Sequence, residues 1–440
     1  MRAVERQASW ALTEEAPEVH PRASTDPVPR ARASQGQGTV VSSIVSGHVT
    51  SPRGVRAAGG HCGIKPSRPD LALVVTAAPA AAAACFTTNR VQAAPVLVSR
   101  EQVRGGRAQA VVINSGNANA CTGEQGRRDA WEMVDLVARA LGISRALVLV
   151  ASTGVIGVPL PRERLRSGIP ALAASLGPHG EQAAEAILTT DAFPKTGAVQ
   201  IEIGGHAVTL GGMAKGAGMI HPRMATTLSL VTTDAAVDPP LLQRALRFAV
   251  GRSFNRISVD GDTSTNDTIF LLATGAAGAA LLRSPEDPGF AEFQDALVAL
   301  TQHLAHQIVR DGEGATKVIA VTVSGAASDE DARRAGEAIT TSLLVKTAAY
   351  GMEPNWGRIL AAVGRSGAEV DPARVAVSVG GVHLVEGGVG HGERMPAAAQ
   401  AMRAPEFAIE VDLGLGPGSW SGWTCDLTEA YVRLNSGDMT

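Results

Sequence analysis

The stretch from Gly211 to Asp234 reads GGMAKGAGMIHPRMATTLSLVTTD, and the interpretation of the whole chain starts from it. Its glycines allow positive φ angles and close approach of the backbone to a ligand, and they surround one lysine, Lys215. After Ala225 and Thr226 the residues become β-branched, which is typical of a strand. We therefore expect a glycine-rich loop that presents a threonine where a strand begins.

The hydroxyl of Thr226 is a poor nucleophile unless a base lies beside it. If the peptide bond before this residue breaks, its own α-amine becomes available, with a reference pKa of about 7.7–8.0, much closer to neutrality than that of lysine. A loop threonine that caps a helix or starts a strand explains the segment equally well. These residues alone favour the second explanation.

Outward from this stretch, short β-branched runs alternate with helical Ala/Leu patterns, which indicates an α/β or α+β fold with much antiparallel sheet. Gly204-Gly205 and Gly380-Gly381 predict two hairpins. Leu71–Phe86 is expected to form two strands joined by a turn at Pro79. The other predicted strands are Ala110–Ile113, Leu147–Ala151, Ile269–Ala273, Val318–Val323 and Phe407–Leu413. The predicted helices are Asp129–Leu141, Arg162–Leu176, Leu241–Val250, Phe290–Val309 and Asp331–Val345.

The composition excludes several classes of protein. Apolar residues make up 45% of the 440 positions and charged residues 18%, as in globular chains with a sizeable core. The net charge of −3 argues against a phosphate-backbone binder, and 8 Phe, 5 Trp and 2 Tyr are too few for base stacking, so no nucleic-acid partner is expected. No apolar stretch is long enough to span a membrane.

Residues 1–45 mix Arg, Glu, Pro, Ser and Gln without periodicity, which predicts a disordered N-terminal extension. This segment lacks the apolar core of a signal peptide, and its glutamates argue against a transit peptide. The cysteines are widely spaced, with no CxxC pair, so we expect reduced thiols in a cytoplasmic protein. They are Cys62, Cys85, Cys121 and Cys425.

Several generic motifs for metal, nucleotide or catalytic sites are incomplete or absent. His303 and His306 are one helical turn apart but lack further ligands, so surface histidines are expected and no metal site. Gly388, Gly390 and Gly392 have no surrounding strand-loop-helix unit and are interpreted as turns. There is no Walker loop, HExxH or GxSxG motif.

Nine blocks of sequence lie in order along the chain and together point to a known family. The blocks are CFTTNRVQAAPV (85–96), VVINSGNANACTG (111–123), ASTGVIG (151–157), TTDAFPK (189–195), KGAGMIHPRMAT (215–226), FNRISVDGDTSTNDT (254–268), GEGATK (312–317), KTAAYGMEPNWGRILAAVGRSG (346–367) and WTCDLTEAYVRLN (423–435). Through these blocks the chain resembles the ornithine acetyltransferase (glutamate N-acetyltransferase) family of the cyclic arginine pathway, from about Gly47 to Thr440.

The resemblance implies a precursor that cleaves itself between Ala225 and Thr226 into an α chain (46–225) and a β chain (226–440). Thr226 is then the acetyl-accepting nucleophile, with its freed amine as base. Thr153 and Gly154 match the family's oxyanion hole, although STG after a strand is also a common turn.

The resemblance also implies substrate contacts at six positions. Lys215 suits a carboxylate and Glu313 suits the amino groups of ornithine, while Thr189 could exchange places with its neighbour Thr190 through an alignment slip. The full set is Thr189, Lys215, Thr226, Glu313, Asn435 and Thr440. The terminal SGDMT departs from the usual ending, and Arg223 replaces a small or polar residue. His221 has no family role and is expected to be a bystander.

The implied enzyme transfers acetyl from N2-acetyl-L-ornithine to L-glutamate by a ping-pong mechanism through acetyl-Thr226. No metal or organic cofactor is implied, and the sequence does not decide whether acetyl-CoA is a second donor. The implied fold is a sandwich of β-sheets between helical layers, an N-terminal-threonine-nucleophile acetyltransferase fold assembled as an α2β2 heterotetramer. Three alternatives stay open: a paralogue of specialised metabolism with another acceptor, an N-terminal-nucleophile amidohydrolase, and an uncleaved amino-acid-binding pseudoenzyme.

Overall fold

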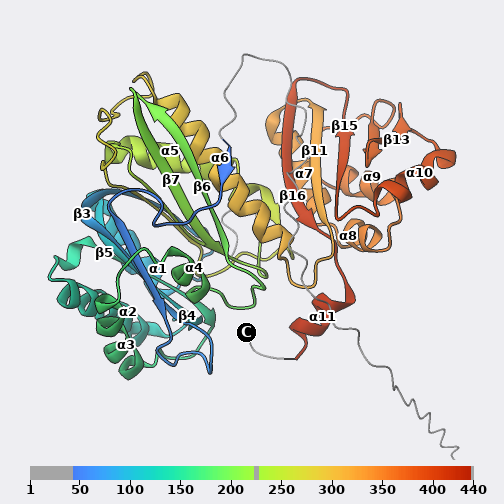
Figure 1. Cartoon of the computed structure of the whole chain (residues 1–440). Coiled ribbons are helices and arrows are strands. Elements are labelled where there is room, and N and C mark those ends of the chain that lie inside the picture. Colours follow the sequence, from blue (N-terminus) through green and yellow to red (C-terminus); the bar gives the residue numbers. More distant parts are fainter. Residues whose placement is uncertain (1–42, 222–226, 438–440) are drawn as a thin grey trace, which may run out of the picture. The chain divides into compact units, whose positions relative to one another are not determined.

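Two β-sheets and their covering helices make up the α/β structure of this chain (Figure 1). The computed structural model describes residues 43–221 and 227–437. The first sheet has nine strands in the order β1-β6-β7-β8-β10-β3-β4-β5, with β2 paired to β3. These strands are β1 (Ile44–Val45), β2 (Val55–Gly60), β3 (Leu71–Phe86), β4 (Arg107–Asn117), β5 (Val148–Val155), β6 (Lys195–Ile203), β7 (His206–Lys215), β8 (Leu228–Thr233) and β10 (Thr268–Ala273).

The strand β3 corrects one prediction, because Leu71–Phe86 forms one strand of 16 residues and not two strands around a turn. Its first part pairs with β2 and its last part with β10, and its register with β4 shifts between Val75 and Ala80. Pro79 lies in this irregular stretch, where its missing N–H interrupts no ladder. The proline therefore marks an irregularity in the strand and not its end.

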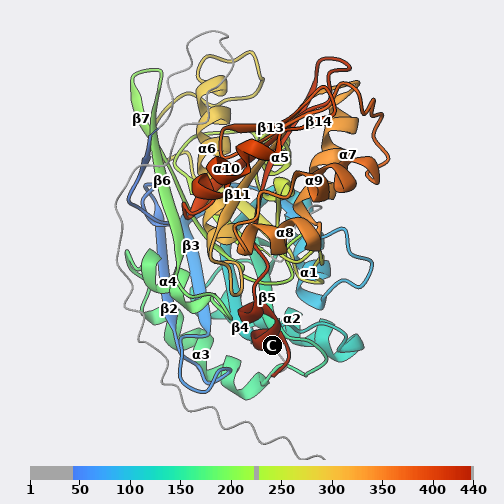
Figure 2. The same ribbon diagram turned by 90° about the vertical axis from the view of Figure 1, so that its right-hand side faces the viewer.

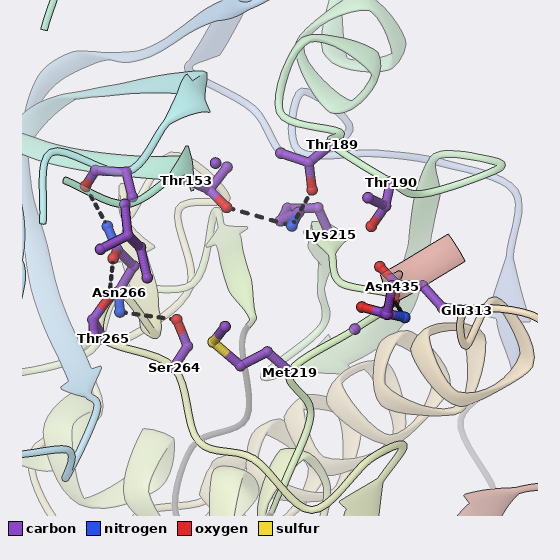
Figure 3. A pocket seen from close by; sticks show the side chains of 14 residues that line it. Thr153, Thr189, Thr190, Lys215, Met219, Ser264, Thr265, Asn266, Glu313 and Asn435 are labelled. Carbon is purple, nitrogen blue, oxygen red and sulfur yellow. Dashed lines mark hydrogen bonds between the residues drawn. The ribbon is translucent and has the colours of Figure 1, made fainter. Parts of the chain in front are cut away.

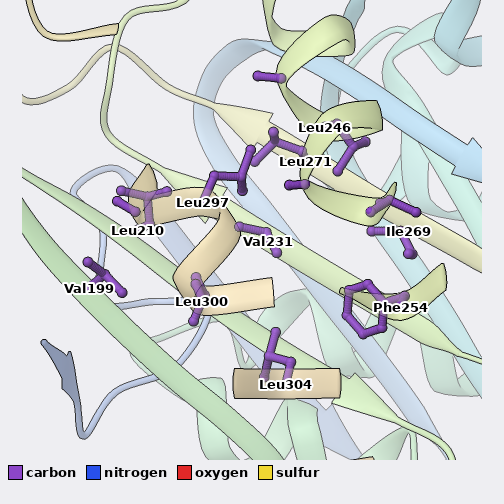
Figure 4. Close-up of a cluster of buried hydrophobic side chains, with 14 of the residues drawn as sticks. Val199, Leu210, Val231, Leu246, Phe254, Ile269, Leu271, Leu297, Leu300 and Leu304 are labelled. Atoms are coloured by element: carbon purple, nitrogen blue, oxygen red, sulfur yellow. The ribbon is translucent and has the colours of Figure 1, made fainter. Parts of the chain in front are cut away.

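The first sheet folds back on itself, so that its two halves share a core. That core takes side chains from β7, β8 and β10 on one side and from β4 and β5 on the other. The outer faces are covered by helices. The helices α1, α2 and α3 pack on β3, β4 and β5. The helices α5 and α6 pack on β6, β7, β8 and β10, and Figure 4 shows this second cluster. The expected sandwich of sheets between helical layers is therefore confirmed. The helices are α1 (Ala94–Gln102), α2 (Gly123–Leu141), α3 (Arg162–Ala174), α4 (Gly180–Ala186), α5 (Pro239–Gly251) and α6 (Phe290–Arg310).

The second sheet has seven strands in the order β14-β13-β12-β15-β11-β16-β9, and α7 to α10 gather beside it (Figure 2). Its strands are β9 (Ile257–Ser258), β11 (Val318–Ala326), β12 (Ala376–Val379), β13 (Val382–Glu386), β14 (Val389–Gly390), β15 (Glu406–Asp412) and β16 (Gly418–Cys425). The helices are α7 (Asp329–Thr340), α8 (Leu343–Tyr350), α9 (Trp356–Gly364), α10 (Met395–Ala401) and, near the end of the chain, α11 (Glu429–Asn435).

The helix predicted at Asp331–Val345 is two helices. The hydroxyl of Ser342 accepts a hydrogen bond from the backbone N–H of Val345, so this serine caps a new helix, α8, directly after α7 ends. The other predicted helices and strands are present with shifted ends, and both double-glycine hairpins are confirmed. Gly390 lies in the short strand β14 and not in a turn.

The four cysteines are free thiols. Among the described residues no helix is long and apolar enough to cross a membrane. Most of the extension predicted at residues 1–45 falls outside the part of the chain that the structure describes. Its last two residues, Ile44 and Val45, are not disordered, because they form β1 and pair with β6.

Candidate active site

A cavity of about 110 Å³ brings together most of the predicted site residues (Figure 3). Its walls come from segments far apart in the sequence: the end of β5, the loop before β6, the end of β7, the loop before β10 and the end of α11. The lining residues are Ala118, Thr153, Gly154, Ile156, Thr189, Thr190, Lys215, Gly218, Met219, Ser264, Thr265, Asn266, Glu313 and Asn435.

Thr153 and Gly154 stand at the end of β5, where the strand meets the cavity. Gly154 has φ +130°, and a Cβ at this position would lie 2.4 Å from the carbonyl carbon of Gly116 on β4. Only glycine adopts this φ angle without strain, and only a residue without a side chain fits so close to Gly116. The fold therefore fixes the backbone beside the Thr153 hydroxyl.

Lys215 ends β7 and is 3% exposed, yet its ammonium group lies at the cavity wall. Its Nζ donates hydrogen bonds to Thr189 Oγ1 at 2.7 Å and to Thr153 Oγ1 at 3.4 Å. Burial lowers the pKa of Lys215, and the nearby carboxylate of Asp191 opposes that shift. The lysine thus joins the two halves of the folded first sheet.

Behind Lys215 lies a buried charge network that the sequence did not indicate. Asp191 Oδ1 accepts hydrogen bonds from Lys195 Nζ at 2.6 Å and from the backbone N–H of Gly216 at 2.7 Å. Lys195 also donates to the carboxylate of Asp311. Burial disfavours the Asp191 carboxylate, but the charges of Lys215 and Lys195 outweigh burial and hold its pKa well below the usual range.

The same aspartate orders the loop before β6. Asp191 Oδ2 accepts the backbone N–H of Thr189 at 2.9 Å and lies 3.8 Å from Lys215 Nζ. Thr189 and Thr190 both line the cavity, but the hydrogen bond from Lys215 goes to Thr189. The geometry therefore favours Thr189 over Thr190 as the predicted substrate contact.

Glu313 and Asn435 meet at the opposite wall. The side-chain amide of Asn435, the last residue of α11, donates a 2.8 Å hydrogen bond to Glu313 Oε2. The backbone N–H of Glu313 donates to Ala217 in the glycine-rich segment after Lys215. A Cβ on Gly218 would lie 2.6 Å from the Glu313 carboxylate, so the absence of a side chain there lets the acid reach the cavity.

The loop Ser264–Asn266 is a part of the wall to which sequence reasoning gave no role. Asn266 Nδ2 donates to the carbonyl oxygens of Ser152 at 2.8 Å and Ala118 at 2.6 Å, and so fastens this loop to the end of β5. The available signal was the polar run DGDTSTNDT between the predicted helix Leu241–Val250 and the predicted strand Ile269–Ala273, because polar loop residues held on a scaffold often bear function.

Ala225, Thr226 and Thr440 lie outside the described residues, as does Arg223. The first residue after this gap, Thr227, is fully buried, and its backbone N–H donates to Asp267 Oδ1 at 3.1 Å. Burial raises the pKa of Asp267 well above that of an ordinary aspartate, although the Thr227 N–H and Lys215 oppose the shift. Asp267 Oδ2 has no hydrogen-bond partner within the described parts of the chain.

The histidines lie away from these contacts. His303 and His306 are partly buried rather than on the surface: His303 lies 3.3 Å from the carbonyl oxygen of Thr196, and His306 lies 3.1 Å from Glu406 Oε1. His221 does not line the cavity. Over residues 43–221 and 227–437, no group of three or more His, Cys, Asp or Glu side chains is arranged to hold a metal ion.

The sequence pattern of the ArgJ family matches residues 56–440. The chain is 52% identical over 400 residues to the arginine biosynthesis bifunctional protein ArgJ of Symbiobacterium thermophilum, covering 90% of this chain and 99% of that protein. It is 53% identical over 374 residues to the protein of the same name from Geobacter sulfurreducens, covering 84% and 95%. A crystal structure of the Bacillus halodurans protein of that name is 44% identical with a TM-score of 0.46, covering 48% of this chain and 98% of that one.

Proposed function

Because the chain belongs to the ArgJ family, we propose that it is an acetyltransferase of arginine biosynthesis that moves acetyl from N2-acetyl-L-ornithine to L-glutamate. The carrying observation is the convergence of Thr153, Thr189, Lys215, Glu313 and Asn435 on one small cavity. An N-acetylated amino acid with a second amino group carries a carboxylate, an amine and a carbonyl. Lys215 can bind the carboxylate, Glu313 can bind the amine, and the threonine hydroxyl groups can bind the carbonyl.

In this proposal Thr226 is the nucleophile, and it becomes active when the chain cleaves itself between Ala225 and Thr226. The hydroxyl attacks the preceding carbonyl, water opens the resulting ester, and the released α-amine then acts as base. The hydrogen bond from Thr227 to Asp267 supports this assignment, since it anchors the backbone one residue after the nucleophile.

Thr153 and Gly154 are proposed to stabilise the oxyanion that forms when Thr226 attacks the acetyl carbonyl. The Lys215 ammonium can only donate, so Thr153 Oγ1 accepts in their contact, and its own hydrogen stays available for a ligand. Together with the backbone N–H of Gly154 it would supply two donors fixed in advance of the reaction.

Lys215 is proposed to bind the substrate carboxylate, with Thr189 beside it, and Glu313 to bind a substrate amino group. Asn435 donates to Glu313 Oε2, which orients the acid while Oε1 remains for the ligand. Thr440 is proposed as the last substrate contact. The acetyl group is held as an ester on the Thr226 hydroxyl between the two half-reactions. The proposed reaction is therefore ping-pong and needs no cofactor.

The proposed mature enzyme consists of an α chain (46–225) and a β chain (226–440), assembled as a cytoplasmic α2β2 heterotetramer. Residues 1–45 are proposed as a dispensable extension except for the last two, because Ile44 and Val45 form β1 and pair with β6. The two chains would share the first sheet, since β7 precedes the cleavage point and β8 follows it. Direct acetylation of glutamate by acetyl-CoA is a further proposed activity, in keeping with the word "bifunctional" in the names of the relatives.

The test is mass spectrometry and denaturing electrophoresis of the purified protein, joined to product analysis with and without glutamate. We expect two fragments that meet at Ala225–Thr226, and acetyl on Thr226 after incubation with N-acetylornithine alone. Thr226→Ala should remain a single inactive chain. Release of free acetate at an equal rate without glutamate would instead indicate a hydrolase, and full activity of an uncleaved chain would overturn the mechanism.

A further inference from the structure

A second cavity, of about 930 Å³, lies where the end of β3 meets the 3₁₀ turn Val103–Gly105 and the start of α5. It is much larger than the catalytic cavity of about 110 Å³ and falls in the size range of small-molecule sites. Its lining residues are Ala82, Ala84, Cys85, Phe86, Arg100, Val103, Arg104, Gly105, Gly106, Asp238, Pro239, Pro240, Gln243 and Arg247.

The charge in this cavity is positive and largely uncompensated. Arg100, Arg104 and Arg247 line it, against the single carboxylate of Asp238. No ion pair within residues 43–221 and 227–437 includes any of the three arginines. Arg100 is held in place, since it donates to Gln92 Oε1 at 2.8 Å and lies over the ring of Phe86, while Arg104 and Arg247 are exposed.

The backbone in this cavity offers little to a peptide. The end of β3 extends beyond β4, which would ordinarily leave an open strand edge. Here Gln243 of α5 closes that edge, because its side-chain amide both donates to the carbonyl of Ala84 at 3.0 Å and accepts from its N–H at 3.1 Å. The N–H of Ala82 donates to Gly106. Strand addition is therefore disfavoured, and the guanidinium groups remain as the available binding groups.

We propose that this cavity binds the phosphate groups of a nucleotide-bearing small molecule. Arginine forks match phosphate oxygens geometrically, and several guanidinium groups without carboxylate partners suit a ligand with more than one negative charge. Two sources share this chemistry: the nucleotide end of a coenzyme A thioester that serves as acyl donor, and a free nucleotide that acts as effector.

The position of the cavity is compatible with either source. Phe86 lines it, and the next residue, Thr87, donates a 2.7 Å hydrogen bond to the carbonyl of Ser264 in the wall of the catalytic cavity. Phe86 in the second cavity is therefore directly followed by a residue that is hydrogen-bonded to the wall of the proposed acetyl-transfer site.

The test is calorimetric titration of the full-length protein with coenzyme A, ADP and inorganic pyrophosphate, with adenosine as the uncharged control. Arg104→Gln combined with Arg247→Gln should weaken binding of the phosphate compounds about tenfold or more. Arg244→Gln, an exposed change on α5 outside the cavity, is the matched control and should leave binding unchanged. Arg104→Lys with Arg247→Lys should retain much of the affinity.

Kinetics separate the two sources. If the double glutamine variant raises the KM for acetyl-CoA while the KM for N-acetylornithine stays constant, the ligand is the acyl donor. If ADP binds and both KM values stay constant in the variant, the ligand is a free nucleotide. Failure of all three phosphate compounds to bind, or equal binding by the double glutamine variant, would overturn the proposal. Since binding is measured without turnover, this result is independent of the acetyltransferase assignment.

Discussion

Lys195 donates a 2.6 Å hydrogen bond to Asp191, and both side chains are completely buried. A buried pair of this kind is retained only when each charge is compensated, because an unpaired charge in the interior is strongly unfavourable. Asp191 also faces Lys215, so one carboxylate compensates two lysines, one structural and one in the wall of the candidate site.

Asp191→Asn should therefore destabilise the fold and impair the site together. Lys195 keeps Asp311 as a partner, but Lys215 loses its compensating charge. We expect the free energy of unfolding to fall by about 3–5 kcal/mol, as for other broken buried pairs, measured by denaturant titration at pH 7. Asp135→Asn, which removes an exposed ion pair with Arg145, is the control and should have a much smaller effect. Equal effects of the two changes would contradict this view of Asp191.

Asp267→Asn should change how stability depends on pH. Burial raises the pKa of Asp267 in the folded state, so between its unfolded pKa and that raised value the native protein binds more protons than the unfolded chain. This difference makes stability fall as pH rises through that range. Asparagine does not titrate, so the stability of the variant relative to wild type should increase with pH. A constant difference from pH 4 to pH 7 would show that the carboxyl titrates normally.

The same residue gives a prediction about chain cleavage. Asparagine retains an oxygen that can accept the N–H of Thr227, whereas alanine does not. Cleavage should therefore proceed in Asp267→Asn and slow down in Asp267→Ala, as followed by denaturing electrophoresis after expression. Cleavage at wild-type rate in the alanine variant would show that this hydrogen bond does not position the scissile peptide.

Substrate binding should weaken at high pH through Lys215. Burial lowers the pKa of Lys215 in the folded state below that of an ordinary lysine, so the ammonium loses its proton at a lower pH than a surface lysine does. The KM for N-acetylornithine should accordingly rise at a pH below about 10.4, the ordinary lysine value near which the substrate's own amine titrates. Circular dichroism at each pH verifies that the fold persists. A KM that stays constant up to this value would exclude Lys215 as the carboxylate ligand.

Gly154→Ala should reduce kcat and stability, because the backbone there has φ +130° and the added carbon would meet Gly116. The strained backbone alone is worth about 1–3 kcal/mol. Gly157→Ala is a matched control three residues away, since its φ is +86° but the new Cβ would have no atom within 4 Å. The control should lose some stability and keep its kcat. A Gly154→Ala enzyme with unchanged kcat would remove Gly154 from the proposed oxyanion hole.

Glu313 and Asn435 should act as one unit. Asn435→Ala, Glu313→Gln and the double variant form a cycle in which the effects on kcat/KM for N-acetylornithine should not add, because the two side chains share a hydrogen bond. Asn435→Asp places a second carboxylate beside Glu313 and should disturb substrate binding more than Asn435→Ala does. Strict additivity across the cycle would mean that the contact does not orient the acid.

Much of the fold follows from periodicity and turn residues. The two double-glycine hairpins and the amphipathic helices were predictable because local chemistry and tertiary structure agree there. The turn predicted at Pro79 is wrong because proline usually ends a strand. Here the pairing with β2 and β4 is interrupted around Pro79, so no backbone N–H is needed at that position. The break between α7 and α8 depends on one serine cap at Ser342, which a continuous helical pattern conceals.

The site was predictable only in part, and chiefly through family resemblance. Thr153, Lys215 and Glu313 were assigned roles from matching motifs, and the structure places them around one cavity. Asp191 and Lys195 were missed because charged residues in a sequence are normally solvated, and nothing local marks these as buried. Only the three-dimensional meeting of Asp191, Lys195 and Asp311 makes them recognisable as one network.

The strand β8 lies in the interior of the first sheet, with β7 antiparallel on one side and β10 parallel on the other. If the chain is cleaved at Ala225–Thr226, the connection between β7 and β8 becomes two chain ends, and the first sheet then consists of strands from two separate polypeptides. Refolding after complete denaturation would then be a bimolecular process whose rate falls on dilution, while the uncut precursor refolds at a rate independent of concentration. Maturation would thus make folding a step that each molecule performs once, and the lifetime of the mature enzyme would depend on how slowly its strands separate.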